Sequence, residues 1–257
     1  MVRPVARQFY EDVLRTLIKA KVPFLVGGAL ALKHFAGIVR GTKDLDIFLR
    51  KEDLQRAMEA LSEQGYETEL VFPHWLAKAW SGPHFVDLIF DSANGVCPVD
   101  EGWFEHASQC TLWGMRVLVS PAEEMIVSKA FVMERERFDG ADVYHLIEAC
   151  GPSLDWERLL ARFGEHWRVL LGHLIFFSFV YPQRRDNVPR WLMITLLDRA
   201  KEELGPEDVP VCRGTLLSRE QYLVDVRERG YVDARVAPWG PIPPEDIDRW
   251  TDAIPPR

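Results

Sequence analysis

The chain has 257 residues, of which 47% are hydrophobic and 27% charged, so it can bury a substantial core in one large domain or two small ones. Its formal net charge of −8 excludes a general electrostatic attraction to nucleic acid or anionic lipid and leaves open only a local basic patch. The four cysteines include no CxxC pair, which argues against a zinc site or a disulfide framework and favours the reducing cytoplasm.

Two stretches bear on membrane association. Residues 1–21 have the periodicity of an amphipathic helix and lack the continuous apolar core of a signal peptide. The longest apolar stretch, residues 169–181, is too short to span a bilayer and contains a histidine. We therefore expect no membrane partner, a cytoplasmic location, and a buried helix or strand at residues 169–181.

Strands and helices interleave in the first half of the sequence. Hydrophobic periodicity and turn residues predict helices at 9–20, 29–36 and 51–65, and strands at 22–26, 44–50, 66–71, 84–91 and 114–119. This order is typical of an α/β or α+β arrangement.

From residue 120 onward the pattern is mainly helical. Ser120, Pro121 and Glu123 have the spacing of a helix start with a capping box. Further helices are predicted at 142–150, 155–174 and 190–204, and the proline-rich tail, residues 237–257, is expected to be extended. A turn of sequence CGPS separates the two patterns, so we expect domains at 1–150 and 151–257.

Gly27 and Gly28 lie between a predicted strand and a predicted helix. Without side chains they let backbone N–H groups approach a ligand, and the amino terminus of the following helix favours an anion such as phosphate. A purely structural turn is the alternative, because Gly-Gly turns are common.

Asp44 and Asp46 are separated by one residue in a predicted strand, so both carboxylates should project from the same face while Leu45 and Ile47 enter the core. Such a pair suits Mg²⁺, which proteins hold with a few carboxylates together with substrate phosphates. An exposed strand edge with charges that prevent aggregation is the alternative.

Asp87 favours the metal-site interpretation of Asp44 and Asp46 over the exposed strand edge. It interrupts an apolar strand, where an aspartate is costly unless it is paired or binds a metal. Three aspartates on strands suit a two-metal site for phosphoryl or nucleotidyl transfer.

Residues 26–48, VGGALALKHFAGIVRGTKDLDIF, together with the later Asp87, resemble the signature of the DNA polymerase β-like nucleotidyltransferase superfamily. Residues 120–146, SPAEEMIVSKAFVMERERFDGADVYHL, look most similar to the bacterial branch with the AbiEii-type toxin and small antibiotic nucleotidyltransferases. The resemblance covers roughly residues 5–150. It implies an α+β fold, with a mixed sheet and flanking helices, followed by a mainly helical C-terminal domain.

The resemblance also implies roles for single residues. Gly27 and Gly28 would hold the β and γ phosphates of a nucleoside triphosphate. Asp44 and Asp46 would bind Mg²⁺, with Mn²⁺ as a substitute, and Asp87 would bind a second metal ion and act as general base. Ala29 stands where many members have serine, so one hydroxyl contact to phosphate is absent.

Four further positions are weaker candidates. Lys129 falls on the apolar stripe of its predicted helix and is assigned to the triphosphate, with a structural pair to a buried carboxylate as the alternative. Asp142 resembles a further acid of that branch, or else caps the next helix. Arg40 and Thr42 precede the aspartates and are assigned to phosphate or acceptor contacts, although such residues more often belong to a solvated loop.

Two classes of function follow. The first is a nucleotidyltransferase that moves a nucleoside monophosphate from a triphosphate to the hydroxyl of a small molecule, a tRNA end or a protein. The second is a catalytically silent nucleotide-binding or interaction protein of a toxin-antitoxin type system.

Residues 211–235 either shape an acceptor pocket or form a helix with a charged outer face. The sequence leaves the acceptor, the preferred base and the oligomeric state open.

Overall fold

The structure, a computed structural model, describes residues 4–41, 44–206 and 208–253. Its internal contacts divide the chain into two compact units. The sheet unit comprises Met1–Ser92 and Pro98–Pro121, and the helical unit comprises Ala93–Cys97 and Ala122–Arg257. This division does not coincide with the expected boundary between residues 150 and 151.

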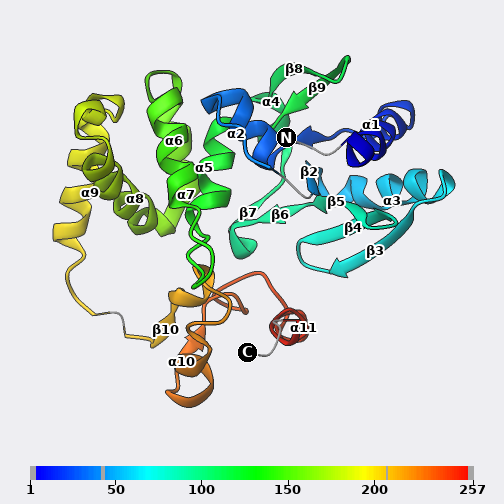
Figure 1. Cartoon of the computed structure of the whole chain (residues 1–257). Coiled ribbons are helices and arrows are strands. Elements are labelled where there is room, and N and C mark those ends of the chain that lie inside the picture. The colour runs from blue at the N-terminus through cyan, green and yellow to red at the C-terminus, as the bar shows by residue number, and fades with distance from the viewer. Residues whose placement is uncertain (1–3, 42–43, 207, 254–257) are drawn as a thin grey trace. The chain divides into compact units, whose positions relative to one another are not determined.

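The sheet unit contains a seven-stranded mixed sheet with the order β3-β4-β5-β2-β1-β9-β8 (Figure 1). β2 runs parallel to β5 and β1 parallel to β9, whereas the other neighbours are antiparallel. The strands are β1 (Leu25–Val26), β2 (Asp44–Phe48), β3 (Glu67–Phe72), β4 (Leu76–Ser81), β5 (His84–Ile89), β8 (Ser108–Leu112) and β9 (Met115–Val119). The helices are α1 (Pro4–Lys19), α2 (Gly28–Ala36), η1 (Lys51–Asp53), α3 (Leu54–Glu63) and α4 (Glu101–Glu105).

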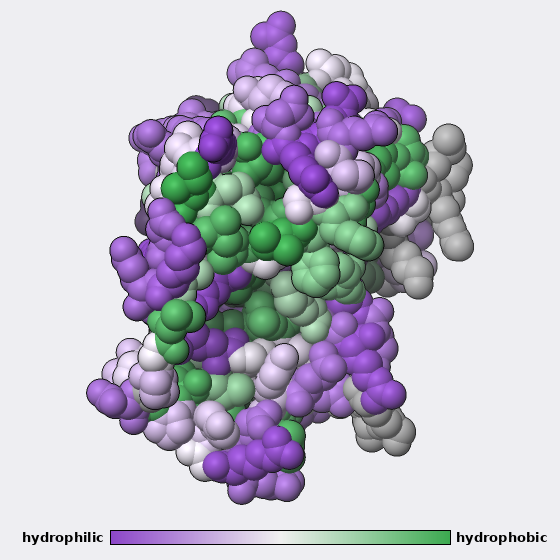
Figure 2. All heavy atoms as spheres, turned by 90° about the vertical axis from the view of Figure 1, so that its left-hand side faces the viewer, coloured by the Kyte–Doolittle hydropathy of each residue, from purple (hydrophilic) through white to green (hydrophobic). Residues whose placement is uncertain are grey.

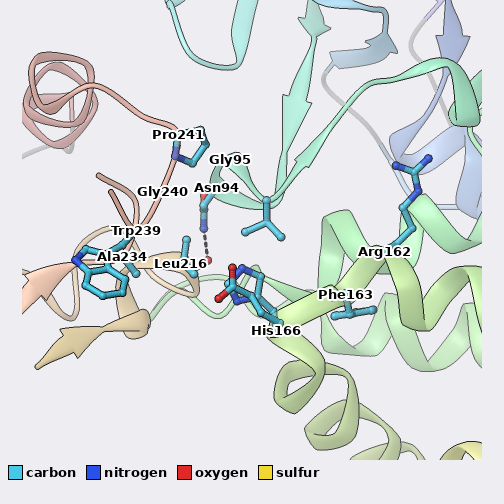
Figure 3. A pocket seen from close by; sticks show the side chains of 13 residues that line it. Asn94, Gly95, Arg162, Phe163, His166, Leu216, Ala234, Trp239, Gly240 and Pro241 are labelled. Carbon is cyan, nitrogen blue, oxygen red and sulfur yellow. Dashed lines mark hydrogen bonds between the residues drawn. The ribbon is translucent and has the colours of Figure 1, made fainter. Parts of the chain in front are cut away.

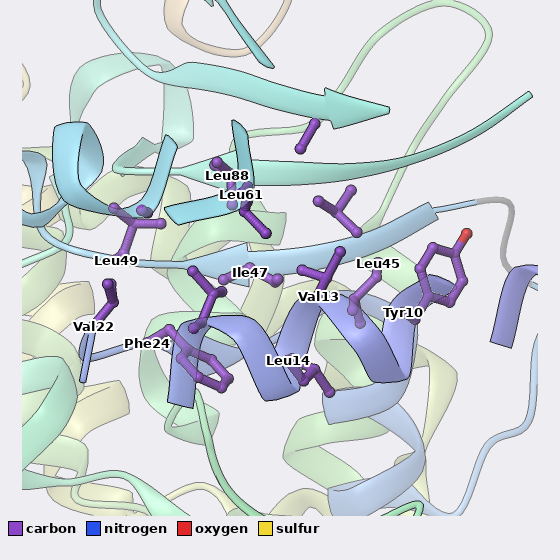
Figure 4. Close-up of a cluster of buried hydrophobic side chains, with 14 of the residues drawn as sticks. Tyr10, Val13, Leu14, Val22, Phe24, Leu45, Ile47, Leu49, Leu61 and Leu88 are labelled. Carbon is purple, nitrogen blue, oxygen red and sulfur yellow. The ribbon is translucent and has the colours of Figure 1, made fainter. Parts of the chain in front are cut away.

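One face of this sheet is covered by α1 and α3, which also pack against each other. Alternate residues of β2 point to this face, so apolar and polar side chains alternate along Asp44, Leu45, Asp46 and Ile47. Leu45 and Ile47 of β2 join Leu14 of α1 and Leu61 of α3 in one cluster in which each of the four side chains is at most 2% exposed (Figure 4). The opposite face of β2 carries the polar residues.

The helical unit begins with α5 and continues through a series of packed helices. Helix α5 packs on α6 and α7, and α8 packs on α6, α7 and α9. The elements are α5 (Ala122–Ala130), α6 (Gly140–Cys150), η3 (Gly151–Ser153), α7 (Trp156–Phe163), η4 (Gly164–His166), α8 (Trp167–Val180), η5 (Pro182–Asn187), α9 (Arg190–Glu202), β10 (Val211–Cys212), η6 (Arg213–Leu216), α10 (Leu223–Glu228), β11 (Val232–Asp233) and α11 (Pro244–Asp252). Three short elements occupy the connecting segment, namely β6 (Asp91–Ser92), η2 (Ala93–Gly95) and β7 (Cys97–Pro98). A mixed sheet followed by a helical C-terminal region is the α+β architecture that the sequence predicts.

The predicted capping box at Ser120 does not form. The Ser120 hydroxyl is buried and has no hydrogen-bond partner among the described residues. Glu123 instead accepts a hydrogen bond from the backbone N–H of Asp155 at 2.8 Å and pairs with Arg158 at 2.6 Å. A guanidinium is a stronger partner for a buried carboxylate than a backbone amide, so Glu123 is directed toward α7.

Two other predictions about helices are wrong. The predicted helix 155–174 is interrupted after α7, because Gly164 has a positive φ of 50°. The tail is not extended throughout, since α11 forms there with Pro244 in its first turn and with Ile247 and Trp250 buried.

The apolar stretch at residues 169–181 lies mostly in α8, but it is buried on one side only. Leu170, Leu174 and Phe177 are buried, whereas Phe176 is 59% exposed and Phe179 is 80% exposed. Among the described residues, no helix is both long enough and apolar enough to cross a membrane.

Two residues on α1 test how much the sheet unit depends on the buried cluster. Leu14→Ala removes a fully buried side chain and should lower the free energy of unfolding by about 2–5 kcal/mol. Ile18→Ala, one turn later on the same helix, removes a side chain that is 45% exposed and should cost less than about 1 kcal/mol. Urea unfolding of both variants measures the difference, and equal losses would contradict this packing.

Candidate functional site

Three aspartates lie on the face of the sheet that is turned away from α1 and α3. Asp44 and Asp46 alternate with the buried Leu45 and Ile47 along β2, which confirms the predicted placement of this pair. β5 runs parallel to β2 with Asp87 directly opposite Asp46. Neighbouring strands are about 4.8 Å apart, so the three carboxylates occupy one small area of the sheet.

Lys78 of β4 forms an ion pair with one of these aspartates. It is the cross-strand neighbour of Asp87, and its Nζ lies 2.6 Å from Oδ1 of Asp87. The ammonium also lies 4.0 Å from the centre of the Phe85 ring. Sequence reasoning missed Lys78, because its position depends on the register of the β4–β5 hairpin.

Asp87 experiences opposing influences on its pKa. Burial raises the pKa of Asp87 above its ordinary value, and the charge of Asp44 raises it further. The hydrogen bond and the charge of Lys78 act in the opposite direction, but the pKa remains raised. Asp87 is therefore a better proton acceptor than a solvent-exposed aspartate.

Tyr10 of α1 also lies close to the aspartates. Its side chain is buried at the edge of the apolar cluster, and Figure 4 shows its hydroxyl directed away from Val13 and Leu14. Burial raises the pKa of Tyr10 to about 12, and the charges of all three aspartates contribute. Tyr10 is thus a neutral hydroxyl within electrostatic range of three carboxylates, and no sequence pattern indicated it.

The Gly27-Gly28 turn contacts β2 so closely that neither residue leaves room for a side chain. The Gly27 N–H donates to the backbone carbonyl of Asp46 at 3.0 Å, and a Cβ on Gly27 would lie 2.2 Å from the Phe48 ring. Gly28 has a φ of +54°, and a Cβ there would lie 1.6 Å from Oδ2 of Asp46. The turn therefore brings the first N–H groups of α2 next to a carboxylate of the cluster.

The donor chemistry of the three aspartates suits a divalent metal ion, because Mg²⁺ prefers carboxylate oxygens. Within the described ranges, however, no group of three or more His, Cys, Asp or Glu residues has the arrangement of a preformed metal site. Burial is the main cause of the raised pKa values of Asp87 and Tyr10, and the negative charge of neighbouring carboxylates adds to it. A divalent cation would fit the residues, because its charge offsets that of the carboxylates and its preferred ligands are oxygen atoms.

Lys129 and Asp142 lie together in the helical unit. The Nζ of Lys129 is 2.7 Å from Oδ2 of Asp142 and 3.2 Å from Oδ2 of Asp139. Asp142 is in the first turn of α6 and does not cap it, because the helix begins at Gly140. The structure thus contains the buried ion pair that the sequence left open as the alternative for Lys129.

The remaining two candidates lie before β2. Arg40 is exposed in the loop that follows α2. Thr42 lies outside the described residues.

The helical unit contains a cavity of about 270 Å³ (Figure 3). Phe163 and His166 from the α7–α8 junction line it, together with Leu216, Trp239 and Pro241 from the C-terminal segment. Burial lowers the pKa of His166, so the imidazole is mainly neutral at pH 7. Leu216 and Ala234, within residues 211–235, contribute to the wall of this pocket, and the short helix α10 lies in the same range; a role of the range in acceptor binding stays a prediction.

Comparison with known proteins gives one family match. The model of a family described as uncharacterised nucleotidyltransferase matches residues 7–170, which is well over half of the chain. A search of curated proteins finds no match.

The solved structures that match the chain include the following three. The antibiotic-resistance factor ANT(2'')-Ia is 15% identical, with a TM-score of 0.45 over 65% of this chain and 95% of its own. The lincosamide antibiotic adenylyltransferase LnuA, with lincomycin bound, is 16% identical, with a TM-score of 0.41 over 56% of this chain and 96% of its own. JHP933 from Helicobacter pylori is 13% identical, with a TM-score of 0.36 over 79% of this chain and 97% of its own.

The close approach of Gly28 to Asp46 can be tested against Gly37, the residue that follows α2. Gly37 also has a positive φ, of 68°, but a Cβ there would meet nothing within 4 Å. Gly37→Ala should therefore lower the free energy of unfolding by about 1–2 kcal/mol through backbone strain alone. Gly28→Ala should cost about 1 kcal/mol or more beyond that, because it also displaces the Asp46 carboxylate. Equal losses in chemical denaturation would contradict the contact.

The pairing of Lys78 with Asp87 predicts a pH-dependent loss of stability. Lys78→Met leaves a part-buried carboxylate without its cation and should lower the free energy of unfolding by about 1–3 kcal/mol at pH 7. The pKa of Asp87 is already raised in the folded state, and this substitution raises it further. The loss should thus be full above the folded pKa and should disappear as the pH falls and the carboxyl becomes neutral.

The double variant Lys78→Met/Asp87→Asn is the control, since it removes both charges. It should regain most of the stability at pH 7 and lose the pH dependence. A loss that is the same at pH 5 and pH 7 would show that Lys78 contributes by packing rather than by its charge.

Proposed function

The chain belongs to the family described as uncharacterised nucleotidyltransferases, and from this premise we propose that it transfers a nucleoside monophosphate from a nucleoside triphosphate to an acceptor hydroxyl, with release of pyrophosphate. One observation carries the proposal. Asp44, Asp46 and Asp87 share one face of the sheet, and the Gly27-Gly28 turn touches the second of them.

The Gly27-Gly28 turn is proposed to bind the β and γ phosphates. The groups that would bind are backbone N–H groups at the amino terminus of α2 other than that of Gly27, which donates to the backbone carbonyl of Asp46. The positive end of the helix dipole favours the charge of the phosphate. Ala29 supplies no hydroxyl, so these contacts depend on the backbone alone.

The three aspartates are proposed to hold Mg²⁺, or Mn²⁺ in its place. Asp44 and Asp46 would bind the ion that accompanies the triphosphate, and Asp87 would bind a second. When bound, such ions offset the negative charge of the phosphates and lower the pKa of an acceptor hydroxyl. The charge of Asp44 raises the pKa of Asp87, and this repulsion supports the assignment because a cation would relieve it.

Asp87 is proposed to take the proton from the acceptor hydroxyl as that oxygen attacks the α phosphorus. Its burial raises its pKa and so increases its basicity. Lys78 contacts Oδ1 of Asp87 and would hold the carboxylate in one orientation. Lys78 would thus act as a positioning residue rather than by contact with substrate.

Three further contacts to substrate are proposed from the sequence. Lys129 is assigned to the triphosphate, and Arg40 and Thr42 to phosphate or acceptor. Lys129 already pairs with Asp139 and Asp142, so a nucleotide would have to share it with these carboxylates. Loss of triphosphate affinity in Lys129→Met with an unchanged melting temperature would support binding, whereas loss of stability alone would support the ion pair.

The proposal predicts metal-dependent binding of nucleotide. A nucleoside triphosphate with Mg²⁺ should raise the melting temperature, and the increase should vanish in Asp44→Ala or when the metal is chelated. Glu63→Gln, which removes an exposed charge from α3, is the matched control and should keep the full increase. A melting temperature that no triphosphate changes would count strongly against the site.

Transfer is tested by incubating the protein with each α-labelled triphosphate and a cell extract. Label on a small molecule, on RNA or on protein identifies the acceptor class. Asp87→Asn should lower the rate of label transfer by at least about 100-fold. Binding of triphosphate without any transfer of label would favour the catalytically silent alternative.

A further inference from the structure

The pair formed by α8 and α9 exposes an apolar face that the helical unit does not cover. Helix α8 is apolar around its whole circumference, which is typical of a helix with packing partners on all sides. Figure 2 is viewed from the side of these two helices and shows apolar side chains gathered there. The exposed apolar residues of the face are Ile175, Phe176, Phe179 and Val180 on α8, and Trp191, Ile194 and Leu197 on α9.

The size of the face is that of a protein interface. Phe176, Phe179 and Trp191 are 59%, 80% and 44% exposed. With about 150–250 Å² for each aromatic side chain, these three alone expose on the order of 400 Å². The largest apolar patch on a typical monomer is about 300–600 Å² in total, and a stable interface needs about 800 Å² from each partner. The four aliphatic residues and their surroundings supply the remainder.

The charges on α9 indicate the kind of partner. Arg190 begins the helix and Glu202 ends it, both side chains are exposed, and the structure records no ion pair for either among the described residues. Each has the wrong sign for its end, because the helix dipole disfavours a cation at the amino terminus and an anion at the carboxyl terminus. Within the described part of the chain, Arg190 therefore lacks a paired anion and Glu202 lacks a paired cation, and each residue has the charge that the other needs.

We propose that the α8–α9 face is the interface of a homodimer with twofold symmetry, in which α9 packs antiparallel to α9 of a second copy. In a twofold dimer the same residues meet from both sides, so Arg190 of each copy faces Glu202 of the other. The two residues are about 18 Å apart along the helix, and an antiparallel partner reverses their order. Both charge pairs then form at the rim, with the apolar residues between them.

A partner whose surface carries charges of only one sign fits this face less well. Arg168 pairs with Glu203 and Lys201 pairs with Asp198 beside the apolar residues, at 2.9 and 2.7 Å. These pairs leave no field of one sign to attract an anionic membrane or an acidic protein. The dimer is independent of the nucleotidyl transfer proposed above, so either proposal can fail alone.

Sedimentation equilibrium over a wide range of protein concentration tests the interface. The wild-type chain should be a dimer, and Phe179→Glu should raise its dissociation constant by about 30-fold or more. Phe179 is 80% exposed in the single chain, so the melting temperature of the monomeric variant should show that it is folded. Val39→Glu changes an apolar position in the sheet unit that is 60% exposed, and it should leave the dimer intact.

Charge reversal tests the antiparallel arrangement. Arg190→Glu and Glu202→Arg should each weaken the dimer several-fold, and the double variant should restore it because both pairs reform with exchanged signs. A wild-type monomer at every concentration, or a dimer that Phe179→Glu does not weaken, overturns the interface. Weakening by each single reversal without recovery in the double variant overturns the antiparallel pairing.

Discussion

The close placement of three carboxylates on one face of the sheet is the constraint on which the geometry of the sheet unit depends. The parallel register of β2 and β5 sets Asp46 opposite Asp87, and the alternation of β2 adds Asp44 to the same face. Folding brings these charges together, so the surrounding residues have to compensate for them. Lys78 does so directly by pairing with Asp87, whereas Tyr10 is kept neutral by its burial and by the charges of the carboxylates.

The same alternation builds the core on the other face. Leu45 and Ile47 can lie in the cluster under α1 and α3 only if their neighbours point the other way, toward the carboxylate site. A shift of β2 by one residue would bury two charges and expose two core side chains. The stability of the core therefore fixes the geometry of the carboxylates, and a mutation in the cluster acts on both.

Patterns that repeat within one element could be predicted from the sequence. The alternation in β2 gave the common face of Asp44 and Asp46, and the interleaved strands and helices gave the mixed sheet and the helical second half. Features that depend on the register between strands could not be predicted: Lys78 reaches Asp87 only through the β4–β5 hairpin. The apolar stretch in α8 was expected to be buried because of its composition, but composition alone does not show how many sides of a helix have partners.

The contact between Gly28 and Asp46 has a consequence for how the site meets a ligand. A backbone hydrogen bond and a van der Waals contact join the turn to the strand, so the amide groups of the turn and the carboxylates cannot move apart independently. The site is thus preorganised: the conformational entropy needed to bring donors and carboxylates together is lost when the chain folds rather than at each encounter with a ligand. Any ligand that uses both the turn and the carboxylates meets them already in place.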